Sequence, residues 1–182
     1  MKKMIVSLFL GGLAAGFFFS GLIVRAEVID KIAAILNDEV ILLSELHEVM
    51  ENPAVNVLVH LDSANSKIQD VLQYVIERQL LAREIQYLAT PKDLETVKSL
   101  AIQYIVNTYY QQQRQPFDQQ LATSGISEAQ LNDELLLYMK GVDYIRRKYR
   151  FNANIDDQDV VMNLFQQWVK ELKTKAQVQI LE

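Results

Sequence analysis

The chain has 182 residues, a formal net charge of −5 and a composition that is 50% hydrophobic. It contains no cysteine, which excludes a disulfide framework and a lipidated N-terminal cysteine. No basic patch dominates the sequence, so nucleic acid is not an expected partner. Beyond residue 26 the only glycines are Gly125 and Gly141, which excludes the clustered glycines of phosphate-binding and dinucleotide-binding loops.

The N-terminal segment has the pattern of a secretory signal peptide. Two lysines form a basic start, residues 4–24 carry no charge, and the small residue Ala26 precedes the expected cleavage point. We therefore expect a signal peptide over residues 1–26 and a single exported domain over residues 27–182. The apolar stretch is also long enough to span a bilayer, so an uncleaved inner-membrane anchor stays open as the alternative.

A β-hairpin is predicted directly after this segment, in VIDKIAAILNDEVILLSELH (residues 28–47), with apolar runs on both sides of NDE. A lone hairpin is marginally stable in water, so it needs a further strand. The other segment with strand-like alternation is AQVQIL (residues 176–181), where Val178 and Ile180 share one face. We therefore predict a small sheet that joins both ends of the mature chain. In this interpretation the hairpin is scaffold, although binding of a partner strand is an alternative role.

Capping residues, prolines and apolar spacing predict helices through the rest of the chain. Ser44 is the expected N-cap of the first helix, and Asn52-Pro53 interrupts it. Thr90 is the expected N-cap of a later helix, whose polar end closes at Pro116. The first four expected helical spans are residues 44–51, 54–61 (helix favoured over strand), 67–89 and 91–113.

Three helices are predicted in the second half of the chain. Ser127 and Gln130 form a capping box that opens the longest helix of this half, with apolar residues at alternating spacings of four and three. Asp156 is the candidate N-cap of the last helix. The expected spans are residues 117–123, 127–150 and 157–174. The predicted fold is therefore mostly α, a multi-helix domain with a small sheet.

The order of these segments resembles the SurA-type periplasmic chaperones and their peptidyl-prolyl isomerase relatives. The residues that carry the resemblance are VIDKIAAILNDEVILLSEL, VLQYVIERQLLAREIQ, ISEAQLNDELLLYMKGVDYIRRKYR and WVKELKTKAQVQILE. In that family the first strands and helices form an N-terminal chaperone domain, and a C-terminal helix and strand complete it. The resemblance thus implies one such chaperone domain over nearly all of residues 27–182, located in the periplasm.

The chain departs from the family pattern at one place. Family members carry one or two parvulin domains between the helix that ends in an RKYR-like segment and the final helix. Here only FNANIDDQDVV (residues 151–161) occupies that position, which is too short for a domain. The resemblance therefore implies a chaperone core without peptidyl-prolyl isomerase activity.

Residues that could carry catalysis or bind metal are few. The histidines are His47 and His60, and a metal site needs further ligands near them. Asp156, Asp157 and Asp159 are explained by capping and by the dipole at the start of a helix. No serine–histidine–aspartate or cysteine–histidine arrangement can be argued. We expect no catalytic, metal-binding or cofactor-binding residues, and no enzyme activity.

A group of aromatic residues falls near the end of one predicted helix, in the short helix and along the long capped helix. Core packing and an exposed client-binding groove are both open for this group, and the apolar seam of the long helix favours core for Tyr138 and Tyr149. The candidate client-binding residues are Tyr109, Tyr110, Phe117, Tyr138, Tyr144, Tyr149 and Phe151.

The expected function is ATP-independent binding of unfolded or partly folded polypeptides, with outer-membrane protein precursors as the client class that the resemblance implies. Such clients would bind in an apolar and aromatic crevice between helices. The alternative is a non-catalytic adaptor or structural protein of the envelope. It would grip one fixed partner, or dimerise by exchange of its C-terminal helix and strand.

Overall fold

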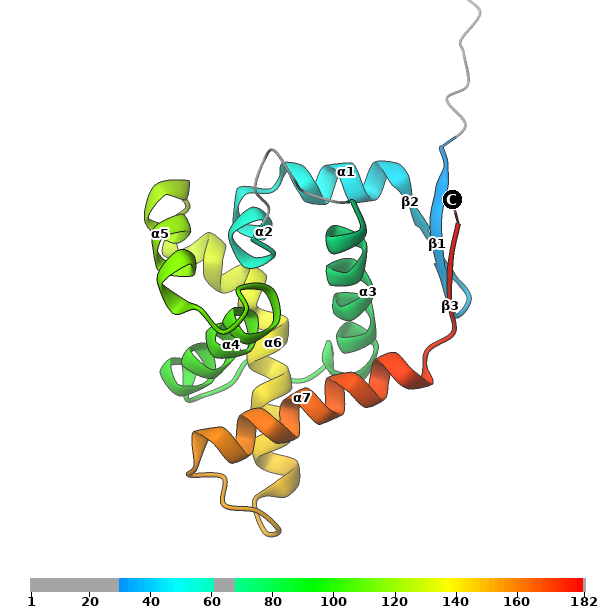
Figure 1. Cartoon of the computed structure of the whole chain (residues 1–182). Coiled ribbons are helices and arrows are strands. Elements are labelled where there is room, and N and C mark those ends of the chain that lie inside the picture. The colour runs from blue at the N-terminus through cyan, green and yellow to red at the C-terminus, as the bar shows by residue number, and fades with distance from the viewer. Residues whose placement is uncertain (1–29, 61–67, 182) are drawn as a thin grey trace, which may run out of the picture.

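The computed structural model describes residues 30–60 and 68–181, which form seven helices and a three-stranded antiparallel sheet (Figure 1). This architecture confirms the predicted mostly helical fold with a small sheet. The expected signal peptide lies outside the described residues. The elements in chain order are β1 (Ile32–Leu36), β2 (Glu39–Leu42), α1 (Leu43–Glu51), α2 (Pro53–Leu58), α3 (Ile68–Ile85), α4 (Leu94–Tyr109), α5 (Arg114–Ser124), α6 (Glu128–Tyr149), α7 (Gln158–Lys175) and β3 (Val178–Ile180).

The sheet joins the two ends of the described chain in the strand order β2-β1-β3. The turn between β1 and β2 contains Asn37, whose φ of 54° lies in the left-handed region that asparagine tolerates. β3 pairs antiparallel with β1 and places Ile180 opposite Ala34. The N–H of Asn37 donates to the carbonyl of Gln177 at 2.7 Å, and the N–H of Gln177 donates to Oδ1 of Asn37 at 2.9 Å. The predicted third strand is therefore present, and the turn asparagine helps to hold it.

One face of the sheet packs against α3, as Figure 1 shows at the right of the molecule. Alternate strand residues point to this face because the side-chain period of a strand is two. Burial of each aliphatic side chain here contributes about 1.5–3 kcal/mol. The buried cluster between sheet, α1 and α3 consists of Ala34, Leu36, Ile41, Leu46, Val71, Leu72, Ile76 and Leu80.

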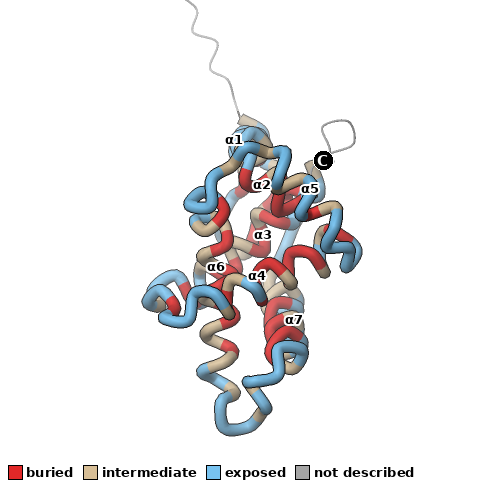
Figure 2. Tube along the Cα trace, turned by 90° about the vertical axis from the view of Figure 1, so that its left-hand side faces the viewer, coloured by how far each residue is buried: buried red, intermediate tan, exposed pale blue. Residues whose placement is uncertain are grey.

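A larger core lies between α3, α4, α6 and α7, where Figure 2 shows buried residues on the inner sides of these helices. Gly141 of α6 lies against the side chains of Phe165 and Trp168 of α7. A Cβ at this position would lie 2.7 Å from Cε2 of Phe165, so a larger residue would force the buried Phe165 ring to shift. The α6–α7 crossing therefore depends on a glycine that the sequence pattern alone did not explain.

The first predicted N-cap is wrong. Ser44 lies inside α1, and its hydroxyl and N–H both donate to the carboxylate of Asp30. The N-cap lies two residues earlier than expected, at Leu42, whose N–H donates to Oε2 of Glu45 at 2.9 Å. The interruption at Asn52-Pro53 is confirmed, since α1 ends at Glu51 and α2 begins at Pro53.

Three later boundaries also differ from the prediction. Asp93, not Thr90, caps α4, because its carboxylate accepts from the N–H of Thr96 and from Arg146 at 3.0 Å. Arg146 thereby holds the pKa of Asp93 below its usual range. Pro116 does not end a helix but lies in the first turn of α5, where a missing N–H costs no intrahelical bond. Asp157, not its neighbour Asp156, caps α7.

The role of β3 can be tested by deleting residues 177–182. The deletion removes every hydrogen bond between β3 and β1 and uncovers one edge of the hairpin. We expect the midpoint of thermal unfolding, followed by circular dichroism, to fall by about 5 °C or more. A control chain that ends at residue 181 should melt like the full-length protein. An unchanged melting temperature after the larger deletion would contradict a stabilising role for β3.

Candidate functional site

The predicted aromatic residues do not lie on one common surface. Tyr110, Phe117 and Tyr138 are buried, so the core interpretation applies to them. Tyr109, Tyr144 and Tyr149 are half-buried against the larger core. Phe151 is the one clearly exposed member, at 82%, and the guanidinium of the neighbouring Arg150 covers its ring. In the described residues these seven side chains therefore do not line a continuous exposed groove.

The buried aromatics instead connect the helices of the larger core. The ring centroids of Tyr104 and Tyr138 lie 5.6 Å apart, and those of Tyr104 and Phe165 lie 4.9 Å apart in an edge-to-face arrangement. Trp168 extends the row to Tyr144, at 5.1 Å. The candidate group omitted Tyr104, Phe165 and Trp168, although all three lie on the apolar stripes of their helices. The position of these three residues on the apolar stripes could have indicated that most of the aromatic residues pack in the core.

A buried ion pair lies beside these rings. Glu77 of α3 is fully buried, and Nζ of Lys173 of α7 lies 2.5 Å from its Oε2. The charged side chains therefore connect two helices that are distant in sequence. A buried carboxylate is costly unless it is paired, so the ammonium group of Lys173, whose side chain is 35% exposed, offsets the burial of Glu77.

The buried environment around Glu77 also raises the pKa of nearby tyrosines. Burial raises the pKa of Tyr104, Tyr109 and Tyr138 well above the ordinary value, and the nearby Glu77 carboxylate raises it further. Burial likewise raises the pKa of Tyr74 and Tyr110. Because their pKa values lie above the ordinary value, these phenols are protonated at neutral pH and do not serve as acids or bases there.

Glu134 of α6 organises a second polar cluster. Its Oε1 accepts from Nδ2 of Asn52 at 2.8 Å, and its Oε2 accepts from the hydroxyl of Tyr74 at 3.1 Å. Arg78 forms an ion pair with the same carboxylate and donates to the Tyr74 hydroxyl at 2.8 Å. Side chains from the end of α1 and from α3 thus bind a carboxylate of α6, and this arrangement fits a structural role.

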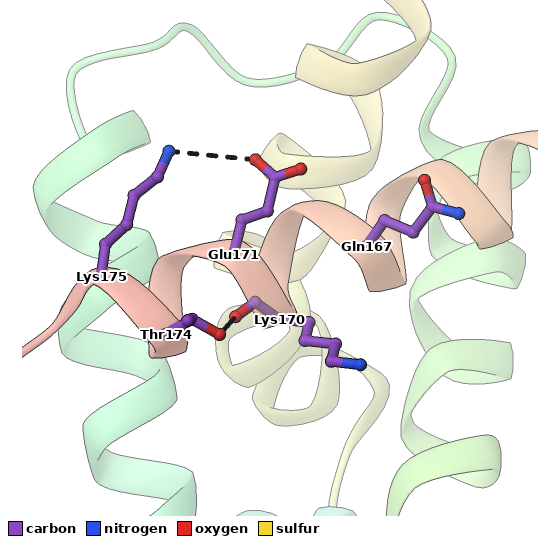
Figure 3. A pocket seen from close by; sticks show the side chains of 5 residues that line it. All are labelled: Gln167, Lys170, Glu171, Thr174 and Lys175. Atoms are coloured by element: carbon purple, nitrogen blue, oxygen red, sulfur yellow. Dashed lines mark hydrogen bonds and ion pairs between the residues drawn. The ribbon is translucent and has the colours of Figure 1, made fainter.

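The hollows on the surface do not resemble an enclosed ligand site. One, of about 340 Å³, is lined by residues of α7 alone, all of them polar or charged (Figure 3). Figure 3 shows Lys175 reaching toward Glu171 across this helix surface. Another, of about 350 Å³ between α3 and α6, mixes Leu136 and Leu137 with Arg78, Asp133 and Lys140. Both are shallow and open to solvent, whereas small-molecule sites enclose most of the ligand surface.

The exposed large apolar side chains gather on the sheet. Of the seven such residues in the described part of the chain, four belong to the three strands: Ile32, Val40, Val178 and Ile180. The other three, Tyr87, Leu94 and Phe151, are scattered over the helical part. We call the four strand residues the sheet apolar surface. Gathered apolar side chains on a soluble domain indicate a binding surface more strongly than single exposed ones.

The sheet apolar surface has two parts, because strand side chains alternate between faces. Val40 pairs with Ile35 on the face turned away from α3, and Ile32 pairs with Leu42 beyond a register irregularity between Ile32 and Ala34. Val178 and Ile180 pair with Leu36 and Ala34 on the face that α3 covers, yet they remain 40% and 53% exposed, because β3 is an edge strand of the sheet. Sequence alternation identified these strands but not which of their residues stay uncovered.

The histidines do not form a metal site in the described ranges, 30–60 and 68–181, where no group of three or more potential ligands occurs. His60 has its Nδ1 at 2.9 Å from Oε1 of Gln120, and its ring stacks on Tyr110 with centroids 4.4 Å apart. His47 is exposed on α1. These contacts give His60 a packing role between α2 and α5.

The buried ion pair can be tested by substituting Lys173 with methionine, which leaves Glu77 without its partner. We expect the free energy of unfolding, measured by urea titration, to fall by about 3 kcal/mol. The double variant E77Q/K173M should regain part of this loss, because it no longer buries an unpaired charge. K175M, which breaks only an exposed pair with Glu171, is the matched control and should shift stability by less than about 0.5 kcal/mol. Equal effects of K173M and K175M would contradict the structural role of the Glu77 pair.

The tyrosine environment predicts loss of stability in alkali. Above about pH 10 the unfolded chain releases phenol protons that the folded protein retains, so the free energy of unfolding must fall as pH rises. We expect tyrosinate absorbance from Tyr74, Tyr104, Tyr109, Tyr110 and Tyr138 to appear together with unfolding monitored by circular dichroism. A Tyr138→Phe variant should show a shallower decline of stability with pH. Ionisation of all tyrosines while the circular dichroism signal stays native would contradict this prediction.

Two further findings bear on the surroundings of this site. None of the helices in the described residues combines the length and apolarity that a bilayer crossing requires. Comparisons of the chain with protein-family models, with curated proteins and with solved structures found no match.

Proposed function

We propose that this protein is an exported, ATP-independent chaperone that binds unfolded or partly folded polypeptides. The observation that carries the proposal is the sheet apolar surface, which gathers four of the seven exposed large apolar side chains on one small sheet. The resemblance of the segments to SurA-type chaperones supports it, and it makes outer-membrane protein precursors the expected clients. Periplasmic location after removal of residues 1–26 is part of the proposal.

The proposed mechanism needs no nucleotide. Clients expose apolar side chains until they fold or insert, and these bind an apolar surface through non-directional contacts. Each contact is weak, so release follows mass action when the client folds or meets a better partner. The sequence predicted that clients bind in a crevice of aromatic residues. Most of these aromatic residues pack in the core, so in this proposal clients bind to the sheet apolar surface instead. Catalysis, including proline isomerisation, is not part of the proposed function.

A structural adaptor or exchanged dimer is the second candidate. The observation that favours it is the position of α7 and β3, which follow a link over residues 150–157 and contact elements from the start of the chain. Such a terminal unit could pair with the same elements of a second copy. Sedimentation equilibrium separates the candidates, since an exchanged dimer would persist on dilution and a monomeric chaperone would not self-associate.

The chaperone function can be tested by diluting a urea-unfolded outer-membrane protein into buffer and following its aggregation by light scattering. We expect the mature protein in excess to suppress the scattering. A variant with threonine at all four positions of the sheet apolar surface should suppress it several-fold less, because apolar contact area is lost while β-branched side chains preserve the strands. Absence of suppression by the wild-type protein would contradict the proposed function.

The matched control carries Tyr87→Thr and Leu94→Thr, which remove exposed apolar side chains away from the sheet. It should suppress aggregation like the wild-type protein. If it loses as much activity as the variant of the sheet apolar surface, general surface hydrophobicity would be responsible and the sheet would have no special role.

A further inference from the structure

Among the described residues, 30–60 and 68–181, the backbone of β3 has no strand partner on one side. In an antiparallel pair, alternate residues direct their N–H and C=O groups toward the partner strand, and those between them point away. Gln177 accepts from Asn37, and Leu181 donates to the carbonyl of Ala33 at 3.0 Å. Residues 177, 179 and 181 therefore face β1. The N–H and C=O groups of Val178 and Ile180 point away from β1, to the outer edge of the sheet at the rim of the molecule (Figure 1).

The opposite edge of the sheet is partly closed. Toward the end of β2 the N–H of Leu42 donates to the side chain of Glu45, and the N–H of Leu43 donates to the carbonyl of Lys31. The chain then enters α1 directly. By the same alternation, Val40 is the one β2 residue whose backbone groups face outward without such a partner. The two edges of the sheet therefore differ, and β3 offers the longer row of outward backbone groups.

The side chains of β3 make this edge apolar and uncharged. Val178 and Ile180 point to the face on which the sheet packs against α3, and they extend the row of Leu36 and Ala34. Sheet edges are normally protected by prolines, bulges or charged side chains, and β3 has none of these within VQI. A strand added here would continue the buried layer with its own apolar side chains.

We propose that β3 binds an extended client segment as a fourth strand, with apolar side chains at alternate positions of that segment. The inference rests on the proposed chaperone function and names the client conformation it captures. The apolar side chains of the segment would lie beside Val178 and Ile180, and its polar ones beside Gln179 on the opposite face. Strands of outer-membrane proteins have this alternation of apolar and polar residues. The backbone bonds are independent of the client sequence, and the alternation supplies the selectivity.

A second copy of the chain fits this edge less well. β3 has three residues, which corresponds to a length of only about 10 Å. Two such strands side by side would bury far less than the area of about 1,200 Å² that stable protein interfaces need. A short edge suits a ligand that is bound weakly and released, as the proposed function requires.

The direct test is hydrogen exchange of the mature protein, followed by NMR, with two synthetic peptides of the same composition. One peptide alternates valine or tyrosine with serine or glutamine, and the other places the same residues at helical spacing. We expect the alternating peptide to slow exchange of the Val178 and Ile180 amides, because they become hydrogen-bonded. Unchanged exchange at these amides under saturating peptide would overturn the proposal.

A pair of substitutions separates the backbone bond from the side chain. Ile180→Pro and Ile180→Thr both remove the isoleucine, but only proline removes the outward N–H. We expect I180P to bind the alternating peptide about fivefold more weakly than I180T, as loss of one backbone hydrogen bond implies. Leu94→Pro is the control away from the sheet, because Leu94 is the first residue of α4, where proline is tolerated, and it should bind like the wild-type protein. Equal affinities of I180P and I180T, in chains that melt alike, would overturn the proposal.

The outcomes also distinguish this inference from the proposed function. If the wild-type protein suppresses client aggregation and I180P suppresses it equally well, the strand-addition proposal fails and the chaperone function stands. If the wild-type protein suppresses no aggregation but binds the alternating peptide at β3, the chaperone function fails and the edge binds a different extended partner. Self-association that I180P abolishes would show that a second copy occupies the edge, which contradicts the proposed occupant.

Discussion

The pairing of β3 with β1 is the constraint on which the rest of the structure depends. A hairpin of two short strands has too little buried area to persist alone, and the third strand comes from the other end of the described chain. Because β3 follows α7 after only Ala176 and Gln177, the pairing also fixes where α7 ends. With that end fixed, α7 lies across α3, α4 and α6 and closes the larger core. The sheet and the helical core are thus joined through α7, which contacts the core helices and leads into β3.

The attachment of α7 combines a steric and an electrostatic condition. Gly141 permits the close approach of Phe165, and the buried Glu77 accepts Lys173 at one position of α7 along the helix. Apolar packing alone would tolerate a shift of one helix along another, but a buried carboxylate left without its cation would not. The ion pair therefore favours the same position of α7 that the pairing of β3 with β1 requires.

The fold was largely predictable from local patterns, whereas the candidate site was not. Alternation at Val178 and Ile180 identified the closing strand, and helical spacing identified the long helices. Cap positions failed where tertiary contacts compete, as at Ser44, whose hydroxyl binds Asp30 instead of the start of its own helix. The aromatic group was misleading because exposure depends on which helices cover a ring. The sequence around Glu77 does not predict its burial, and the sequence of β3 does not predict that one edge of this strand is exposed. Both features depend on how distant parts of the chain pack.

The character of the exposed surface fits the problem that a general chaperone must solve. Its clients share no sequence, so recognition must rest on what every unfolded chain presents, which is apolar side chains and an unpaired backbone. A deep aromatic crevice would select particular side chains. In this protein the aromatic residues mainly pack between α4, α6 and α7. In the proposed function, the short apolar sheet edge would offer backbone groups at Val178 and Ile180 and would require only alternation from its ligand. Because the edge is short, affinity per client segment would stay low, and a client that can form its own sheet would leave by completing its own hydrogen bonds.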